Sequence, residues 1–369
     1  MPLRARLYPF TVKLPLANWL AASLGLGFAS LVSAPAFAQA GAEPAPAPAA
    51  AAPAPAEAPA PNAAAEAPPA APVEAPPPAA AEVPPAAPPA DKPKPPPYSL
   101  PFQLRPIAPA SVIRSDTSLG LYKNAAGDSG NAVASLLLVS YKVTPDFAPL
   151  VRVGVVSNSP PSPGKSATNF MNPVIGGLYG IKLSPELKLG LFLGLTVPIG
   201  SGGGNDAAAE KKAANGAGIA TRAAMDNAMF AVNDFTVFPG VGLAYVAHGF
   251  TAQVEATLLQ LTRVKGDAPA VPDSSRTNFT TGIHLGYFLI PMLSVGAELR
   301  HQRWLSTPAA VKANSAARDT STFAVGPRVH VKLSPTMWLR PGVSFGMPLD
   351  DPMKTSKYKL FQLDIPFVF

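Results

Sequence analysis

The feature that most constrains this 369-residue chain is a strict two-residue alternation from Leu187 to Ile199. Apolar aliphatic residues occupy every odd position of this segment, and Lys, Gly, Phe, Thr or Pro occupy the even positions. Because successive side chains of a β-strand point to opposite faces, the pattern predicts one strand with two different environments. The segment is longer than a typical globular strand of about five or six residues. It is long enough to cross a bilayer, which takes about nine to eleven residues.

The same alternation recurs along the rest of the C-terminal region, and we expect twelve strands. They cover residues 111–122, 133–142, 150–158, 173–183, 187–199, 237–245, 251–258, 278–289, 293–302, 322–333, 339–347 and 361–369. The connections between them alternate between short ones and long, polar ones. Several of the short connections contain Ser-Pro or Thr-Pro, which favour turns. Short turns at one end and long loops at the other are typical of an outer-membrane β-barrel, and an even strand number puts both chain ends on the short-turn, periplasmic side.

A soluble β-sandwich is the alternative fold, since its strands also alternate. However, the face opposite the apolar one is rich in Gly rather than in Lys, Glu, Asn and Ser. Small residues suit the crowded interior of a small barrel, and aromatic residues near the segment ends suit the girdles at a membrane interface. These features favour an all-β, transmembrane, antiparallel up-and-down barrel.

The N-terminal regions have a different composition and predict export. Residues 1–38 combine early basic residues, an apolar run and Ala36-Phe37-Ala38, as in a cleaved signal peptide. An uncleaved membrane anchor is the alternative. Residues 39–97 are almost entirely Ala and Pro with sparse Glu, which predicts a disordered, semi-rigid linker in the periplasm. Residues 98–369 then form the barrel, placed in the outer membrane.

The composition also excludes several classes of function. The chain has no Cys and only four His, none at metal-motif spacing, so we expect no metal and no cofactor. No Ser stands two residues after any His, an arrangement expected of a barrel lipase, and no phosphate-binding loop is present. We therefore expect no enzyme activity, and the lack of aromatic platforms beside the basic residues argues against nucleic acid as a partner.

The signal peptide, the alternating strands and the chain end together resemble a Gram-negative outer-membrane β-barrel protein of the porin or channel type. The last strand resembles the signal read by the barrel-assembly machinery; its residues are Phe361, Leu363, Ile365, Phe367 and Phe369. Residues 172–179 and 195–200 resemble strand motifs of the phenol meta-pathway class of channel-type transporters, although Ile199 stands where Thr is common there. The resemblance implies outer-membrane lipid and the assembly machinery as partners.

The inward face of such a barrel carries most of the charged strand residues. They include Arg114, Asp116, Arg152, Lys188, Glu255, His284, Glu298, Arg300, Arg328, His330 and Arg340. Residues 98–369 hold 24 Lys and Arg against 16 Asp and Glu. A basic lumen concentrates anions, so we predict a channel or transporter for small anionic or polar solutes.

Two alternatives remain open at this stage. The inward charges could instead neutralise each other and fill the barrel, since Arg114 and Asp116, like Glu298 and Arg300, stand two residues apart on one face. The protein would then be a non-catalytic structural barrel. It would anchor the envelope through its linker, with peptidoglycan or a periplasmic protein as partner, and its outer loops would contact other surfaces.

The longest loop, residues 200–233, has partly helical spacing after a Gly-rich start. It predicts either a helix that folds over or into the barrel and constricts it, or a mobile outer loop with a frayed helix.

Overall fold

The computed structural model describes residues 98–268 and 273–369. The predicted signal peptide (1–38) and linker (39–97) lie outside the described residues. Within the described part of the chain, no helix is long and apolar enough to cross a membrane.

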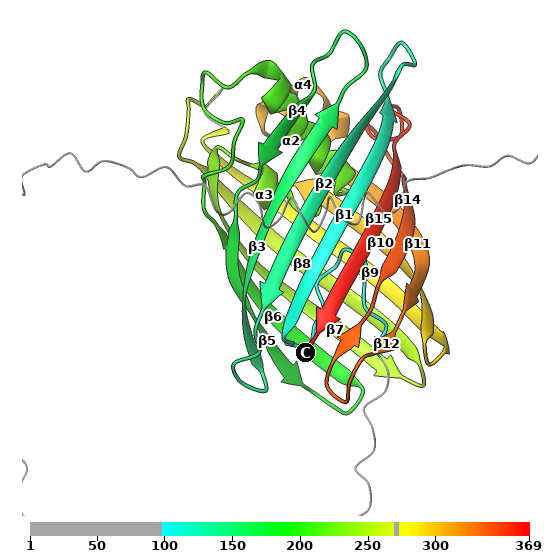
Figure 1. Ribbon diagram of the computed structural model, residues 1–369. Helices are drawn as coiled ribbons and strands as arrows, with labels where there is room; N and C mark the ends of the chain where they lie inside the picture. Colours follow the sequence, from blue (N-terminus) through cyan, green and yellow to red (C-terminus); the bar gives the residue numbers. More distant parts are fainter. Residues whose placement is uncertain (1–97, 269–272) are drawn as a thin grey trace, which may run out of the picture. The chain divides into compact units, whose positions relative to one another are not determined.

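One antiparallel sheet closes on itself to form a barrel (Figure 1). In the described part of the chain, twelve strands make its wall. They are β1 (Val112–Lys123), β2 (Ser129–Ser140), β3 (Phe147–Ser159), β5 (Val174–Lys182), β6 (Leu187–Thr196), β7 (Asp234–Ala247), β8 (Phe250–Arg263), β9 (Ser275–Ile290), β10 (Leu293–Trp304), β11 (Asp319–Val329), β14 (Gly342–Pro348) and β15 (Lys359–Val368). Each pairs with its neighbour in chain order, and β1 pairs with β15 from Val112↔Val368 to Leu121↔Lys359, which closes the barrel.

Three short strands and four helical segments complete the described part. The strand β4 (Ala167–Phe170) pairs with β3 beyond the end of β5, and β12 (Val331–Lys332) pairs with β13 (Trp338–Leu339) at the short-turn end. The helices are α2 (Ala209–Thr221), α3 (Asn227–Phe230), α4 (Ala309–Ala313) and the 3-10 helix η2 (Ser315–Arg318). They lie in the long loops, whereas the C-terminus lies at the opposite end, among the short turns (Figure 1).

The predicted alternation appears directly in β6. Leu191, Leu193 and Leu195 are 43%, 52% and 37% exposed, whereas Phe192 and Thr196 are buried. A sandwich would bury the leucines against a second sheet, so that alternative is wrong. The exposed apolar face continues around the wall in the other strands, as lipid contact requires. The twelve-stranded transmembrane barrel is confirmed.

The short-turn end carries a ring of exposed aromatic residues. Tyr141, Tyr179, Tyr245 and Tyr287 are each between 45% and 61% exposed and lie in or next to the short turns. Tyrosine is favoured at membrane–water interfaces because its ring is apolar and its hydroxyl is polar. These four tyrosines therefore mark one edge of the belt of exposed apolar side chains that faces the membrane.

The belt predicts where an added charge destabilises the barrel. Leu191 lies in the middle of β6, so we expect Leu191→Arg to cost about 2–4 kcal/mol of unfolding free energy in lipid vesicles. Ile199 is also exposed but lies beyond the end of β6, so Ile199→Arg should cost about 1 kcal/mol or less. Urea unfolding in vesicles measures both, and equal costs would contradict this placement of the belt.

Candidate functional site

The segment that precedes the first strand lies inside the barrel. Residues 98–111, which we call the inner segment, precede β1 and have no regular secondary structure. Phe102 and Leu104 are buried there. Inward side chains of the wall bind the backbone of the segment: Glu255 Oε2 accepts from Arg105 N (2.8 Å), Gln362 Nε2 donates to Phe102 O (2.8 Å), and Gln253 Nε2 donates to Arg105 O (2.7 Å). The wall thus replaces the hydrogen bonds that the segment would make with water.

The glycines of the inner face make room for this segment. A Cβ added at Gly282 would lie 2.5 Å from Leu104 Cδ2, and one added at Gly190 would lie 3.0 Å from Ile107 Cγ2. The sequence showed a crowded interior through these glycines but did not show that residues 98–111 cause the crowding. The inner segment was missed because it carries no periodic pattern.

The long loop between β6 and β7 also folds into the barrel, as one of its two predicted arrangements requires. At the end of α2, Arg222 is fully buried. Its guanidinium donates to both carboxylate oxygens of Asp116 on β1 at 2.7 Å and to Asp226 Oδ2 at 2.8 Å. Arg152 on β3 also pairs with Asp226 and lies 3.7 Å from Asp116. We call these four residues the Arg222 cluster.

The charges of the Arg222 cluster stabilise one another. Burial alone would raise the pKa of the Asp226 carboxyl, but Arg152 and Arg222 outweigh burial and hold that pKa below its ordinary value. A lowered folded-state pKa contributes stability that is present at neutral pH and is lost only as the pH falls below the ordinary Asp range, about 4. The cluster therefore holds the loop at neutral pH.

The backbone next to Arg222 is strained. Ala223 and Ala224 have φ angles of +50° and +56°, which L-residues other than Gly, Asn and Asp seldom adopt. Such a conformation persists only where the surroundings hold it, and here the paired Arg222 immediately precedes it.

The predicted inward residues fall into groups. Glu298 is fully buried; its Oε2 accepts from Arg300 at 2.5 Å, its Oε1 accepts from the Phe102 backbone, and His284 Nδ1 lies 3.6 Å away. Arg114 and Arg328 both pair with Asp364, at 2.6 and 2.5 Å. The proposed local pair of Glu298 with Arg300 therefore forms.

The other proposed local pair, Arg114 with Asp116, does not form. Arg114 lies opposite Pro366 in the β1–β15 register, so its side chain reaches Asp364 across the barrel seam. Asp116 turns to Arg222 instead. The spacing in the sequence indicates only neighbours on the same strand. The actual partners, Asp364 and Arg222, lie on another strand and in a loop.

The remaining predicted inward residues lie in the part of the lumen nearer the short turns, which we call the lower lumen. Glu255 lies 3.6 Å from the Arg105 guanidinium of the inner segment. His330 Nε2 lies 2.8 Å from Ser294 Oγ. Lys188 and Arg340 line a cavity at the short-turn end. The residues of the predicted assembly signal lie on β15 and at the chain end, with Phe361, Leu363 and Phe369 exposed on the outer face and Ile365 and Phe367 only partly so.

We call the inner segment and the long loop (residues 197–233) together the inserts. Sequence reasoning gave no role to two buried side chains that hold them. Gln103 Nε2 of the inner segment donates to Arg222 O at 2.5 Å, so the inner segment and the loop meet inside the barrel. Asn172 is fully buried; its Oδ1 accepts from Gly200 N and its Nδ2 donates to Ala231 O, both at 2.9 Å. Asn172 stands in the motif that resembles channel-type transporters and fixes both ends of the loop.

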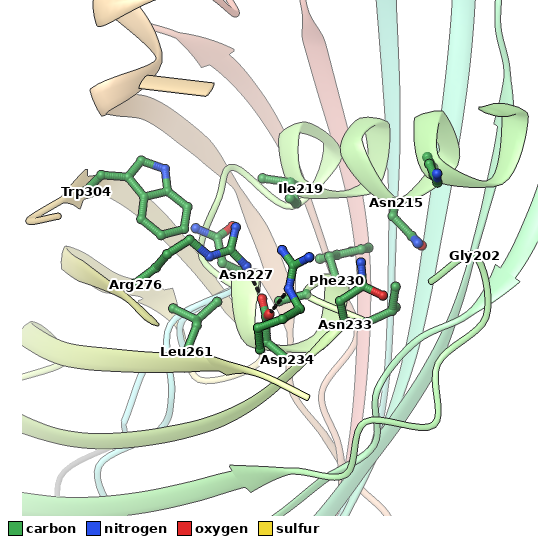
Figure 2. A pocket seen from close by; sticks show the side chains of 14 residues that line it. Gly202, Asn215, Ile219, Asn227, Phe230, Asn233, Asp234, Leu261, Arg276 and Trp304 are labelled. Atoms are coloured by element: carbon green, nitrogen blue, oxygen red, sulfur yellow. Dashed lines mark hydrogen bonds and ion pairs between the residues drawn. The ribbon is translucent and has the colours of Figure 1, made fainter. Parts of the chain in front are cut away.

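Two cavities border the inserts, one beside the long loop and one beside the inner segment. A cavity of about 210 Å³ at the long-loop end is lined by Phe230, Leu261, Arg276 and Trp304 (Figure 2). Arg263 and Arg276 both pair with Asp234 at its edge. A larger cavity, of about 650 Å³, lies at the short-turn end, and Phe192 is part of its lining.

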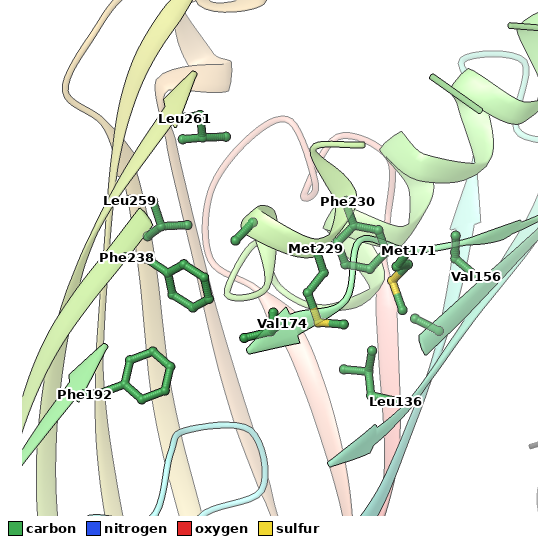
Figure 3. Close-up of a cluster of buried hydrophobic side chains, with 12 residues drawn as sticks. Leu136, Val156, Met171, Val174, Phe192, Met229, Phe230, Phe238, Leu259 and Leu261 are labelled. Atoms are coloured by element: carbon green, nitrogen blue, oxygen red, sulfur yellow. The ribbon is translucent and has the colours of Figure 1, made fainter. Parts of the chain in front are cut away.

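An apolar column connects the two cavities. Leu261, Leu259, Phe238 and Phe192 follow one another down the inner face of β8, β7 and β6 (Figure 3). The rings of Phe238 and Phe192 lie 5.5 Å apart. Leu261 lines the cavity at the long-loop end, the upper cavity, and Phe192 lines the cavity at the short-turn end, the lower cavity. The column therefore runs from one cavity to the other. Among the described residues, no group of three His, Asp or Glu side chains could hold a metal ion.

No protein-family model and no curated protein matches this sequence. Solved structures of similar shape include the COG4313 outer membrane channel from Pseudomonas putida F1, with 15% identity, 73% of this chain and 98% of that chain covered, and a TM-score of 0.46. The NanC porin has 9% identity, coverage of 69% and 98%, and a TM-score of 0.42. The KdgM porin in complex with disordered oligogalacturonate has 10% identity, coverage of 70% and 99%, and a TM-score of 0.40.

Removal of Arg222 should release the loop. Arg222→Ala leaves Asp116 and Asp226 to share Arg152, and breaking a buried pair by removing one partner costs about 3–5 kcal/mol. We expect trypsin to cut at the exposed Lys211 and Lys212 of α2 at least about tenfold faster than in the wild type, because local opening controls cleavage.

The control for this experiment is Arg303→Ala. Arg303 pairs with Asp319 at 3.2 Å, but its side chain is 52% exposed, and such surface pairs contribute about 0–1 kcal/mol. Cleavage at Lys211 and Lys212 should therefore not change. An Arg222→Ala variant as resistant as this control would show that the cluster does not hold the loop.

Proposed function

We propose that this protein is an outer-membrane channel for small anionic or polar solutes, and that the α2–α3 loop restricts its lumen. The observation that carries the proposal is the pair of cavities, of about 650 and 210 Å³, at the two ends of a lumen that the inserts divide. The exposed apolar belt supports a place in a membrane, and the short-turn end, where the C-terminus lies, corresponds to the periplasmic side of such barrels.

The charges at the lower cavity support an anionic solute. Arg105, Arg114, Lys188 and Arg340 line it, and no Asp or Glu is among its described lining residues. A cavity with one sign of charge and low-dielectric walls raises the local concentration of the opposite ion.

A closed structural barrel is the second candidate. It is favoured by the buried ion pairs of Glu298, Asp364 and the Arg222 cluster, which lie inside the barrel. In that case the linker would provide the function by anchoring the envelope. Conductance separates the two candidates.

Removal of the constriction should enlarge the channel. In a variant with residues 205–230 replaced by a short Gly-Ser linker, Asp116 and Arg152 keep each other as partners, so the barrel should still form. We expect purified wild-type protein to give small openings in planar bilayers and the variant to give larger ones. Absence of openings in both would refute the channel and favour the structural barrel.

A reversible lock tests whether α2 moves. A Cβ added at Gly120 on β1 would lie 3.3 Å from Thr221 Cβ on α2, close to the separation of about 3.5–4.5 Å in disulfides. The chain has no Cys, so Gly120→Cys with Thr221→Cys introduces a single thiol pair. We expect oxidation to lower the conductance and reduction to restore it. Equal currents in both states would show that the channel opens without movement of α2.

A further inference from the structure

The cavity at the short-turn end has the features of a binding site rather than of a plain water-filled vestibule. Its volume of about 650 Å³ lies in the range of small-molecule pockets, roughly 300–1,000 Å³. Much of its lining is apolar, with Leu138, Leu178, Phe192, Phe288 and Trp338 contributed by strands around the barrel. The apolar column that descends from the upper cavity ends in this lining at Phe192.

Arg340 is the cation in this cavity that most lacks a partner. Its guanidinium carbon lies 5.1 Å from the centre of the Trp338 ring. Its Nε is buried without a hydrogen-bond partner. Within residues 98–268 and 273–369, no carboxylate lies within ion-pair distance of its side chain, whereas the neighbouring Arg328 pairs with Asp364 at 2.5 Å. Arg340 as a whole is half-buried, but its buried Nε has no acceptor. A buried donor without an acceptor is costly, and an anionic ligand would supply one.

Lys188 adds a second cation on β6, on the other side of the barrel from Arg340 in the strand order. It too has no carboxylate within ion-pair distance among the described residues. The other cations of the lining are engaged: Arg114 with Asp364, and Arg105 with Glu255. The cavity therefore combines aromatic and aliphatic walls with two unpaired cations and no acid among its described lining.

We propose that this cavity binds an organic anion with an apolar, preferably aromatic, body, whose carboxylate pairs with Arg340. The ring of the ligand packs against Trp338 and Phe288, and Lys188 adds long-range attraction. The proposal deepens the proposed channel function and rests on it in one respect, because the ligand is taken to be a solute that passes along the lumen. Binding itself can be measured without conduction.

The experiment uses benzoate and benzamide as probes, which have nearly the same shape and differ in charge. Isothermal titration of the full-length protein in detergent micelles, with empty micelles as blank, gives a dissociation constant for each. We expect benzoate to bind about tenfold or more tightly than benzamide, as hydrogen bonds to a charged group imply.

Three variants identify the residues responsible. Arg340→Gln should bring the two probes within about threefold of each other, and Arg340→Lys should restore part of the preference, because it restores the charge without the planar fork. Lys188→Gln should reduce benzoate binding by about threefold, as expected of a weaker charge contribution. Lys142→Gln is the matched control, because Lys142 lies exposed in a turn at the same end but is not part of the lining.

The outcomes separate this proposal from the channel. Equal affinity for the two probes in the wild type, or a preference that survives in Arg340→Gln, would overturn the site. A clear preference in a protein that never conducts would leave the site standing and refute the channel. Loss of the preference in Lys142→Gln as well would show a general surface-charge effect and would also overturn the site.

Discussion

Closure of the sheet is the constraint on which the rest of the structure depends. In lipid, backbone groups have no water to bind, so every strand of the wall needs a neighbour on both sides. The pairing of β1 with β15 satisfies this requirement for the first and last strands. Because β1 starts at the short-turn end, the chain before it must either leave the barrel there or enter the lumen. Residues 98–111 enter the lumen, where inward side chains bind their backbone.

Closure also creates an interior in which charges need partners. Removing a charged group from water is costly unless an opposite charge or a set of hydrogen bonds replaces the water. The wall supplies some partners itself, such as Arg300 for Glu298. The inserts supply the others: Arg222 comes from the loop to Asp116, and the backbone of Phe102 and Gln103 comes from the inner segment to Glu298. The same polar groups therefore stabilise the barrel and hold the inserts that narrow it.

The strands could be predicted from the sequence because their pattern is local. A period of two in β6 or β15 appears within ten residues, and the direction of the apolar face follows from it. The inserts could not, because their contacts join residues far apart in the chain, such as Gln103 with Arg222. The helical spacing in residues 200–233 indicated a helix but not where it packs. The glycines indicated a crowded lumen, and only the structure shows that Leu104 and Ile107 occupy it.

The two sides of the lumen differ in chemistry, and this difference bears on what could pass. The ion pairs of Asp364 and Glu298 lie on β1, β10, β11 and β15, next to the inner segment. The apolar column lies on β6, β7 and β8, and β7 and β8 also carry the ion pairs of Asp234 and Glu255. A solute on the ion-paired side would have to separate charges that are already paired, which is costly in a buried site. The apolar column ends in a cavity lined by the unpaired Lys188 and Arg340. There the Arg105 guanidinium, which pairs with Glu255, lies 4.3 Å from the centre of the Phe192 ring. Fewer paired charges line the column than the opposite side, and this difference is the physical basis of the organic-anion site that we propose.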